Sequence, residues 1–271
     1  MSTNAVRYGP RPPEAQVDHE IDATKAPIAT EAITITYLTD PEIVAAVLPK
    51  PLEPAAEPLV RIQLQRVRIE GRPPFGSAVF SVAAGHGELE GDYPLFMPQS
   101  TEQSVTGGRE TFGEPKKLAH IEVERNGDRL TATVERLGYQ LIKVKGQITG
   151  PAELPPDQVN TEFYFKFLRA PDGSGITDPH LVYGEYHRHY EQLECIDGTL
   201  ELGESPLDPV ADIVIHQITS VTWCRRRTVQ VGRIAARVPQ EWLLPYVHQR
   251  YDDPHDEIAL FAAPGPEPAR V

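Results

Sequence analysis

Period-two alternation of apolar and polar residues is the pattern that most constrains how this chain folds. In residues 33–37, Ile-Thr-Ile-Thr-Tyr, the odd positions are apolar and the even positions are polar, which is typical of a strand with one buried face. Residues 60–69 also alternate, but their apolar parity changes between Leu64 and Val67, which predicts a β-bulge and a bend. The same criteria predict further strands at residues 78–83, 130–134, 141–148, 161–168, 181–186, 216–223 and 229–238.

About three helices are expected between these strands. The first begins at Pro41 behind an Asp40 N-cap, and the others lie near residues 100–112 and 240–251. Pro245 interrupts the last of them. Many short strands with few helices predict a mainly β (α+β) fold built on an antiparallel barrel or sandwich.

The chain is expected to contain one domain. Its 271 residues are enough for one large core, and all-β domains commonly fill this length. Residues 1–27 are rich in proline and charge and are predicted to form an N-terminal arm. Residues 263–271 have the same character and are predicted to be a disordered tail, which leaves residues 28–262 for the single domain.

Composition argues against several classes of function. The formal net charge is −13, whereas nucleic-acid binding needs clustered excess Lys and Arg, so no DNA or RNA partner is expected. The basic run at residues 225–227 is interpreted as the exposed side of a strand start. Cys195 and Cys224 lack CxxC spacing, and the His-Arg-His run at residues 187–189 lacks a third ligand, so no disulfide framework and no metal site are predicted. No stretch approaches the roughly 18 apolar residues of a membrane span, so we expect no membrane partner and a cytoplasmic location.

The residues best suited to covalent chemistry are two adjacent lysines, Lys116 and Lys117, in a segment interrupted by Gly113 and Pro115. Neighbouring side chains of an extended segment point to opposite faces, so one amine can enter a pocket while the other faces solvent. Burial of a lysine disfavours its ammonium form and leaves free amine to attack a carbonyl carbon. On this motif alone, a solvated surface turn is the competing interpretation.

The order and spacing of several short motifs resemble those of the acetoacetate decarboxylase superfamily. The most specific part of the resemblance is the pairing of Gly-Arg-Glu at residues 108–110 with Pro-Lys-Lys at residues 115–117. The other matching stretches are Tyr-Leu-Thr-Asp (37–40), Leu-Pro-Lys-Pro-Leu-Glu (48–53), Pro-Leu-Val-Arg (58–61) and Glu-Gly-Asp-Tyr-Pro (90–94). The resemblance implies an antiparallel β-barrel or cone with flanking strands, assembled into homo-oligomers.

The resemblance also implies roles for residues of these motifs. Lys116 corresponds to the Schiff-base lysine and Lys117 to its neighbour, and Arg109 and Glu110 support them. The small-molecule partner implied is a carbonyl compound. No cofactor is implied, because the imine itself withdraws electrons from the substrate.

Three positions at which the family carries ionisable side chains are neutral in this sequence. Thr30 stands at the position of an arginine, and Gln63 and Ser77 stand at the positions of two acidic residues. Phe96 and Met97 align with an apolar wall of the family's pocket. A pocket so depleted in charge is expected to handle a substrate carboxylate and its protons differently from acetoacetate decarboxylase.

A proton shuttle must therefore come from another residue. Glu114 lies two residues before Lys116, so in an extended segment both side chains share one face. A partly desolvated carboxylate can exchange protons near neutral pH. A solvent-exposed glutamate is the alternative.

These observations predict a lyase that forms a Schiff base between Lys116 and a small oxo acid. Aldol, retro-aldol or dehydration chemistry is the expected outcome. A β-keto acid decarboxylase, a β-diketone hydrolase and a non-catalytic barrel that binds a small ligand are the alternatives.

Overall fold

The computed structural model describes residues 8–10, 28–253 and 255–258 and has the mainly β architecture that the sequence predicts. The strands are β1 (Ile28–Leu38), β2 (Glu53–Pro54), β3 (Leu59–Arg68), β4 (Phe75–His86), β5 (Leu89–Gln99), β6 (Lys116–Leu118), β7 (His120–Asn126), β8 (Arg129–Arg136), β9 (Tyr139–Pro151), β10 (Gln158–Arg169), β11 (Ile176–Leu202) and β12 (Gln217–Arg237). The helices are α2 (Pro41–Val47), α3 (Glu102–Thr111), α4 (Gln240–Leu243) and α5 (Val247–Arg250), with 3-10 turns at Val210–Asp212 and Leu244–Tyr246. The predicted tail and all of the predicted arm except residues 8–10 lie outside the described residues.

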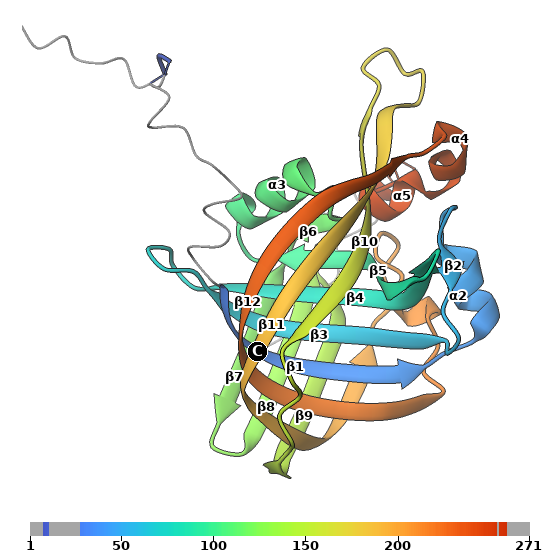
Figure 1. Ribbon diagram of the computed structural model, residues 1–271. Helices are drawn as coiled ribbons and strands as arrows, with labels where there is room; N and C mark the ends of the chain where they lie inside the picture. The colour runs from blue at the N-terminus through green and yellow to red at the C-terminus, as the bar shows by residue number, and fades with distance from the viewer. Residues whose placement is uncertain (1–7, 11–27, 254, 259–271) are drawn as a thin grey trace, which may run out of the picture.

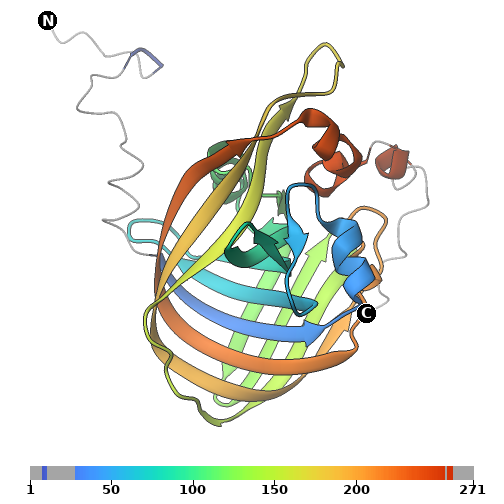
Figure 2. The ribbon, with the colours of Figure 1, turned by 45° about the vertical axis from the view of Figure 1, so that its right-hand side comes forward.

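Seven of the strands form a ring. Their order is β10-β5-β4-β3-β1-β12-β11, and β11 pairs with β10 again, so the strands close on themselves. The ring is not a regular barrel, because β10 meets β5 only through the parallel pair of Glu162 and Asp92. The second half of β11 leaves the ring and pairs with β9, which continues into β8 and β7. Figures 1 and 2 show the curved ring strands, with α3 near one end. The predicted barrel or cone with flanking strands is confirmed in this form.

Two strands that the sequence pattern predicts separately form one long strand in the structure. The strands predicted at residues 216–223 and 229–238 are parts of β12, which is continuous over 21 residues. The run at residues 225–227 therefore lies inside a strand. Arg225 and Arg227 reach Glu191 at the surface, whereas Arg226 projects from the opposite face and is 3% exposed. The interpretation of this whole run as an exposed strand start is wrong for Arg226.

The bulge predicted in β3 is absent. This strand keeps a continuous register with both β1 and β4. Ile62 and Leu64 pack into the main core from one face, and Gln65 and Val67 are buried on the other face. The change of apolar parity therefore reflects a strand with two buried faces and not an additional residue.

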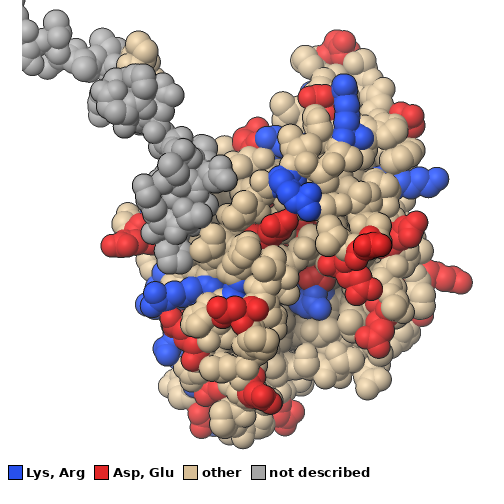
Figure 3. All heavy atoms as spheres, viewed as in Figure 1, with Lys and Arg blue, Asp and Glu red and all other residues tan. Residues whose placement is uncertain are grey.

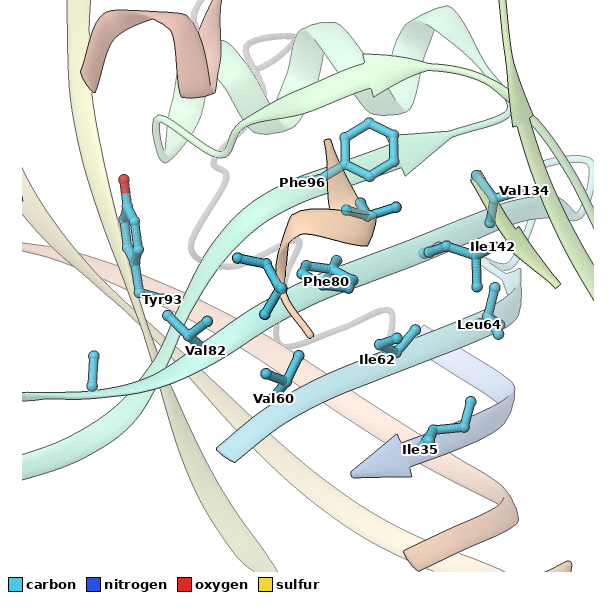
Figure 4. Close-up of a cluster of buried hydrophobic side chains, with 14 of the residues drawn as sticks. Ile35, Val60, Ile62, Leu64, Phe80, Val82, Tyr93, Phe96, Val134 and Ile142 are labelled. Carbon is cyan, nitrogen blue, oxygen red and sulfur yellow. The ribbon is translucent and has the colours of Figure 1, made fainter. Parts of the chain in front are cut away.

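The main core joins the ring strands to the flanking strands. Figure 4 shows Ile62, Leu64 and Phe80 from the ring near Val134 and Ile142 from β8 and β9. A smaller apolar cluster contains Val79, Met97, Tyr164 and Val182, with Phe112 packed against it. Strand alternation places this cluster on the second face of the ring strands.

The helices follow the sequence signals closely. Helix α2 begins at Pro41 behind Asp40, and α3 lies within the predicted residues 100–112. The helix expected at residues 240–251 is divided around Pro245 into α4, a 3-10 turn and α5, because proline cannot continue the helical hydrogen bonding. None of the helices in the described ranges is long and apolar enough to cross a bilayer.

Candidate active site

A cavity of about 230 Å³ lies against the second face of the ring strands and beneath α3. Its walls come from β1, β3, β4, β5, β10, β11 and β12, together with α3 and the start of β6. The charged residues that line it are Arg72, Glu114, Lys116, Glu162, Arg188 and Arg226. On the outer face drawn in Figure 3, acidic and basic side chains are interspersed. The gathering of charge inside the cavity makes it the candidate site.

Lys116 reaches the cavity because of the way α3 ends. Gly113 has a φ of 85°, the left-handed conformation that commonly terminates helices and favours glycine. A Cβ atom at this position would lie 2.6 Å from the backbone of Lys166, so the close approach of the two chains also requires glycine. The Lys116 amide then donates to the Glu114 carbonyl at 2.8 Å, and β6 begins by pairing with Met97 of β5.

Lys116 and Glu114 form an ion pair in the cavity. Lys116 Nζ lies 2.6 Å from Glu114 Oε2, and the two side chains are 13% and 1% exposed, so both are largely shielded from water. Glu114 Oε1 accepts hydrogen bonds from Gln230 Nε2 at 2.9 Å and from the Tyr186 hydroxyl at 3.2 Å. These donors hold one carboxylate oxygen in place and leave the other facing the amine.

The Gly-Arg-Glu motif packs against this pair. A Cβ atom on Gly108 would overlap Glu114 Oε2 and would lie 2.6 Å from Lys116 Nζ, so only glycine leaves room for the ion pair. Arg109 Nη1 donates to the Lys116 carbonyl at 2.9 Å and thereby ties α3 to β6. Glu110 is exposed and does not line the cavity.

Lys117 and Phe96 lie outside the cavity. Lys117 Nζ is 2.7 Å from both Asp208 Oδ1 and Asp252 Oδ1, and Arg136 pairs with the same two carboxylates. Phe96 belongs to the main core, and its ring centroid lies 5.9 Å from Lys117 Nζ. The two lysines therefore enter different environments, as the divergence of neighbouring side chains in a strand requires.

The remaining pocket residues predicted from the sequence divide into two groups. Thr30, Ser77 and Met97 line the cavity. Gln63 does not line it, and its Oε1 accepts a hydrogen bond from Arg226 Nη2 at 2.6 Å. Thr30 pairs directly with Arg226 across β1 and β12, so a buried guanidinium stands beside the neutral threonine.

The expectation of a charge-poor pocket is wrong, because strands far from the sequence motifs supply a second carboxylate and two arginines. Glu162 is 2% exposed, and Arg188 Nη2 lies 3.5 Å from its Oε1. The Tyr164 hydroxyl donates to Glu162 Oε2 and lies 2.6 Å from the Tyr186 hydroxyl. Tyr186 in turn donates to Glu114, so the contact between the two phenol oxygens brings both carboxylates into one polar cluster.

Burial governs protonation in this polar cluster. It raises the pKa of Glu162 despite the opposing charge of Arg188. Burial, and then the charges of nearby glutamates, raise the pKa of Tyr164 and of Tyr186 well above the ordinary value. Both phenols therefore stay protonated near neutral pH and act as donors.

Several residues of the site were not predicted from the sequence, namely Glu162, Tyr186, Arg188, Arg226 and Gln230. They occupy the polar face of strands whose other face is apolar, and the pattern of a half-buried strand assigns such a face to solvent. The signal that could have found them is the presence of a large aromatic residue, Tyr164, on that supposedly exposed face.

The two histidines of the His-Arg-His run on β11 lie on the face opposite Arg188, which enters the cavity. His187 and His189 are exposed, and His189 Nδ1 is 2.7 Å from Asp157. Over residues 8–10, 28–253 and 255–258, no group of three or more His, Cys, Asp and Glu side chains is arranged to hold a metal ion.

Sequence comparison relates the chain to known enzymes. The model of the family described as acetoacetate decarboxylase matches residues 4–238. The acetoacetate decarboxylase of Burkholderia vietnamiensis (strain G4 / LMG 22486) is 31% identical over 201 residues, which cover 69% of this chain and 78% of that protein. The CLA biosynthesis isomerase of Lactiplantibacillus plantarum is 27% identical over 217 residues, which cover 71% of this chain and 76% of that protein.

Solved structures share the fold. The acetoacetate decarboxylase of Legionella pneumophila superposes with a TM-score of 0.70 at 22% identity, over 78% of this chain and 88% of that one. The enduracididine biosynthesis enzyme MppR, complexed with pyruvate, superposes with a TM-score of 0.66 at 15% identity, over 78% of this chain and 90% of that one. Together with the match to residues 4–238, these findings show that the chain belongs to the acetoacetate decarboxylase family.

Proposed function

We propose that the protein is a lyase that forms a Schiff base between Lys116 and a small oxo acid. The observation that carries the proposal is the 2.6 Å distance between Lys116 Nζ and Glu114 Oε2 in the wall of the cavity. An ammonium group must lose a proton before its nitrogen attacks a carbonyl carbon, and a carboxylate at this distance can accept that proton. Membership of a family of lyases supports the same conclusion.

The chemistry follows from an imine at this position. Lys116 Nζ adds to the carbonyl carbon, and the carbonyl oxygen leaves as water, so that a protonated C=N bond forms. This bond accepts the electron pair released when a neighbouring C–C or C–H bond breaks, and an enamine results. A proton or an aldehyde carbon then adds to the enamine, and hydrolysis of the new imine releases the product and restores Lys116.

Glu114 is the proposed proton shuttle for these steps. Gln230 and Tyr186 hold its Oε1, so Oε2 stays directed at the reacting nitrogen. Burial of the carboxylate excludes competing water and strengthens its interaction with the imine. Arg109 and Gly108 act as positioning residues, since one ties down the backbone of Lys116 and the other leaves space for the pair.

Two reactions can proceed from this imine. Loss of carbon dioxide from a β-oxo acid is favoured by the relative at 31% identity, which is named acetoacetate decarboxylase. Aldol, retro-aldol or dehydration chemistry is the second candidate, since a structure that shares the fold, the enduracididine biosynthesis enzyme MppR, is complexed with the condensation product of pyruvate and imidazole 4-carboxaldehyde. Both reactions require Lys116, and they differ in whether the substrate carboxylate is retained.

Deuterium exchange in heavy water tests the proposal. Enamine formation exchanges the methyl protons of pyruvate and acetone, which NMR detects as loss of the methyl signal, and decarboxylation converts acetoacetate into acetone. We expect the wild-type protein to catalyse exchange and Lys116→Arg to lose it. Lys143→Arg is the matched control, because Lys143 lies on β9 and faces Glu201 at 3.5 Å. Equal exchange by wild type and Lys116→Arg would contradict the proposal.

A further inference from the structure

Arg226 carries a positive charge into the cavity without a carboxylate to balance it. Its side chain is 3% exposed. The guanidinium donates to Gln63 Oε1 at 2.6 Å and to Gln65 Oε1 at 3.4 Å, and its Nη1 lies 3.7 Å from Cys224 Sγ. All of these partners are neutral. Within the part of the chain that the structure describes, no Asp or Glu oxygen lies within ion-pair distance of this arginine.

The charges of the cavity leave Arg226 in excess. Lys116 is balanced by Glu114, and Arg188 is balanced by Glu162. Arg226 is the remaining buried charge of the cavity wall among the described residues. Burying an unpaired charge costs free energy. An anion bound beside Arg226 would offset this cost.

Hydrogen-bond donors are available for such an anion. The Nε atoms of both Arg226 and Arg188 are buried and make no hydrogen bond in the described structure. Both guanidiniums line the same cavity, and burial, followed by the positive charge of Arg226, lowers the pKa of Arg188. An anion between or beside them would relieve this repulsion.

On the basis of the proposed function, we propose that Arg226 is the carboxylate-binding residue of the cavity and holds the anionic end of an oxo acid whose carbonyl carbon reacts at Lys116. A guanidinium binds a carboxylate through parallel charge-assisted hydrogen bonds. Arg72 also lines the cavity but is exposed to solvent, so one excess buried positive charge remains, and it matches a monoanionic substrate. The substrate class is therefore a small monocarboxylic oxo acid, in preference to a neutral ketone or β-diketone.

Borohydride trapping with two matched probes tests this assignment. Pyruvate carries the carboxylate, and methyl pyruvate is its neutral ester with the same carbonyl group. For each probe, the adduct on Lys116 is quantified against concentration by peptide mass spectrometry. The variant is Arg226→Met, which keeps the length of the side chain and removes its charge. The matched control is Arg225→Met, the exposed neighbour on the same strand.

We expect Arg226→Met to raise the half-saturating concentration of pyruvate at least about tenfold and to leave that of methyl pyruvate within about twofold. Arg225→Met should leave both unchanged. Equal effects of Arg226→Met on the two probes, or no effect on either, would overturn the assignment and leave the imine chemistry intact. Absence of any adduct on Lys116 in the wild-type protein would instead count against the proposed function itself.

A measurement on the wild-type protein covers the case in which Arg226→Met does not fold. Acetate has a carboxylate but no ketone carbonyl, and acetamide is its neutral counterpart. Acetate should raise the half-saturating concentration of pyruvate at least about tenfold more than acetamide at the same concentration and ionic strength. Equal effects of the two compounds would contradict a carboxylate site.

Discussion

Replacing Gly108 with alanine should disable the site while leaving the fold intact. The added Cβ atom would overlap Glu114 Oε2 and would lie 2.6 Å from Lys116 Nζ. Ordinary contacts require roughly 3.4 Å, so the reacting groups must move by about 1 Å, and a misplacement of this size costs about 100-fold in rate. The buried Glu114 cannot swing into solvent, because Tyr186 and Gln230 hold it.

Gly107 provides the matched control. It belongs to the same helix and also borders the cavity, but it is exposed and has no atom within 4 Å of an added Cβ, so the substitution displaces neither Lys116 nor Glu114. Gly107→Ala should keep wild-type exchange of pyruvate protons in heavy water and should raise the free energy of unfolding by about 0.5–1 kcal/mol. Gly108→Ala should fold, as shown by circular dichroism and a cooperative melt, and should lose about 100-fold in exchange rate. Exchange by Gly108→Ala within about threefold of Gly107→Ala would show that the added methyl group does not displace Lys116 and Glu114.

Three further outcomes can be checked by standard assays. Lys117→Met leaves Asp208 buried beside one fewer cation, so urea denaturation should show a loss of about 3–5 kcal/mol, and a loss below about 1 kcal/mol would contradict a structural role. The pKa of Asp252 is lowered, since Lys117 and Arg136 outweigh the opposing effect of burial; stability from this group is therefore present above its unfolded-state pKa and is lost as the pH falls through the folded-state value. Asp252→Asn should consequently reduce stability at pH 7 and have little effect in acid, and an equal loss at both would count against the ion pairs. Tyr186→Phe removes one donor to Glu114, so the exchange rate should drop by about 10–100-fold with unchanged secondary structure. A wild-type exchange rate would show that Gln230 alone is enough to hold the Glu114 carboxylate in place.

The sequence predicts correctly those strands that bury only one face. The alternation in residues 33–37 identified β1, and Asp40 with Pro41 located the start of α2. The bulge expected in β3 failed for a physical reason. Its Gln65 and Val67 line a cavity on one side while Leu64 enters the core on the other, and a period-two pattern cannot represent a strand buried on both faces.

The candidate site was predictable around Lys116, where it is local in sequence, and at Thr30, Ser77 and Met97, which the family resemblance placed in the pocket. Lys116, Glu114 and Gly108 are separated by a few residues, so motif and spacing placed them together. Glu162 and Arg226 reach the same cavity through the closure of the ring, which brings β10 and β12 around it. No short-range pattern distinguishes an inward-facing arginine inside Arg-Arg-Arg from its exposed neighbours, because the choice of face depends on strand pairing.

Borohydride reduction of the wild-type protein with pyruvate or acetoacetate, followed by peptide mass spectrometry, identifies the residue that forms the Schiff base. We expect one adduct, located on Lys116, and its absence in Lys116→Arg but not in Lys117→Arg. An adduct on Lys117, or equal labelling of wild type and Lys116→Arg, would contradict the assignment of Lys116 as the Schiff-base residue.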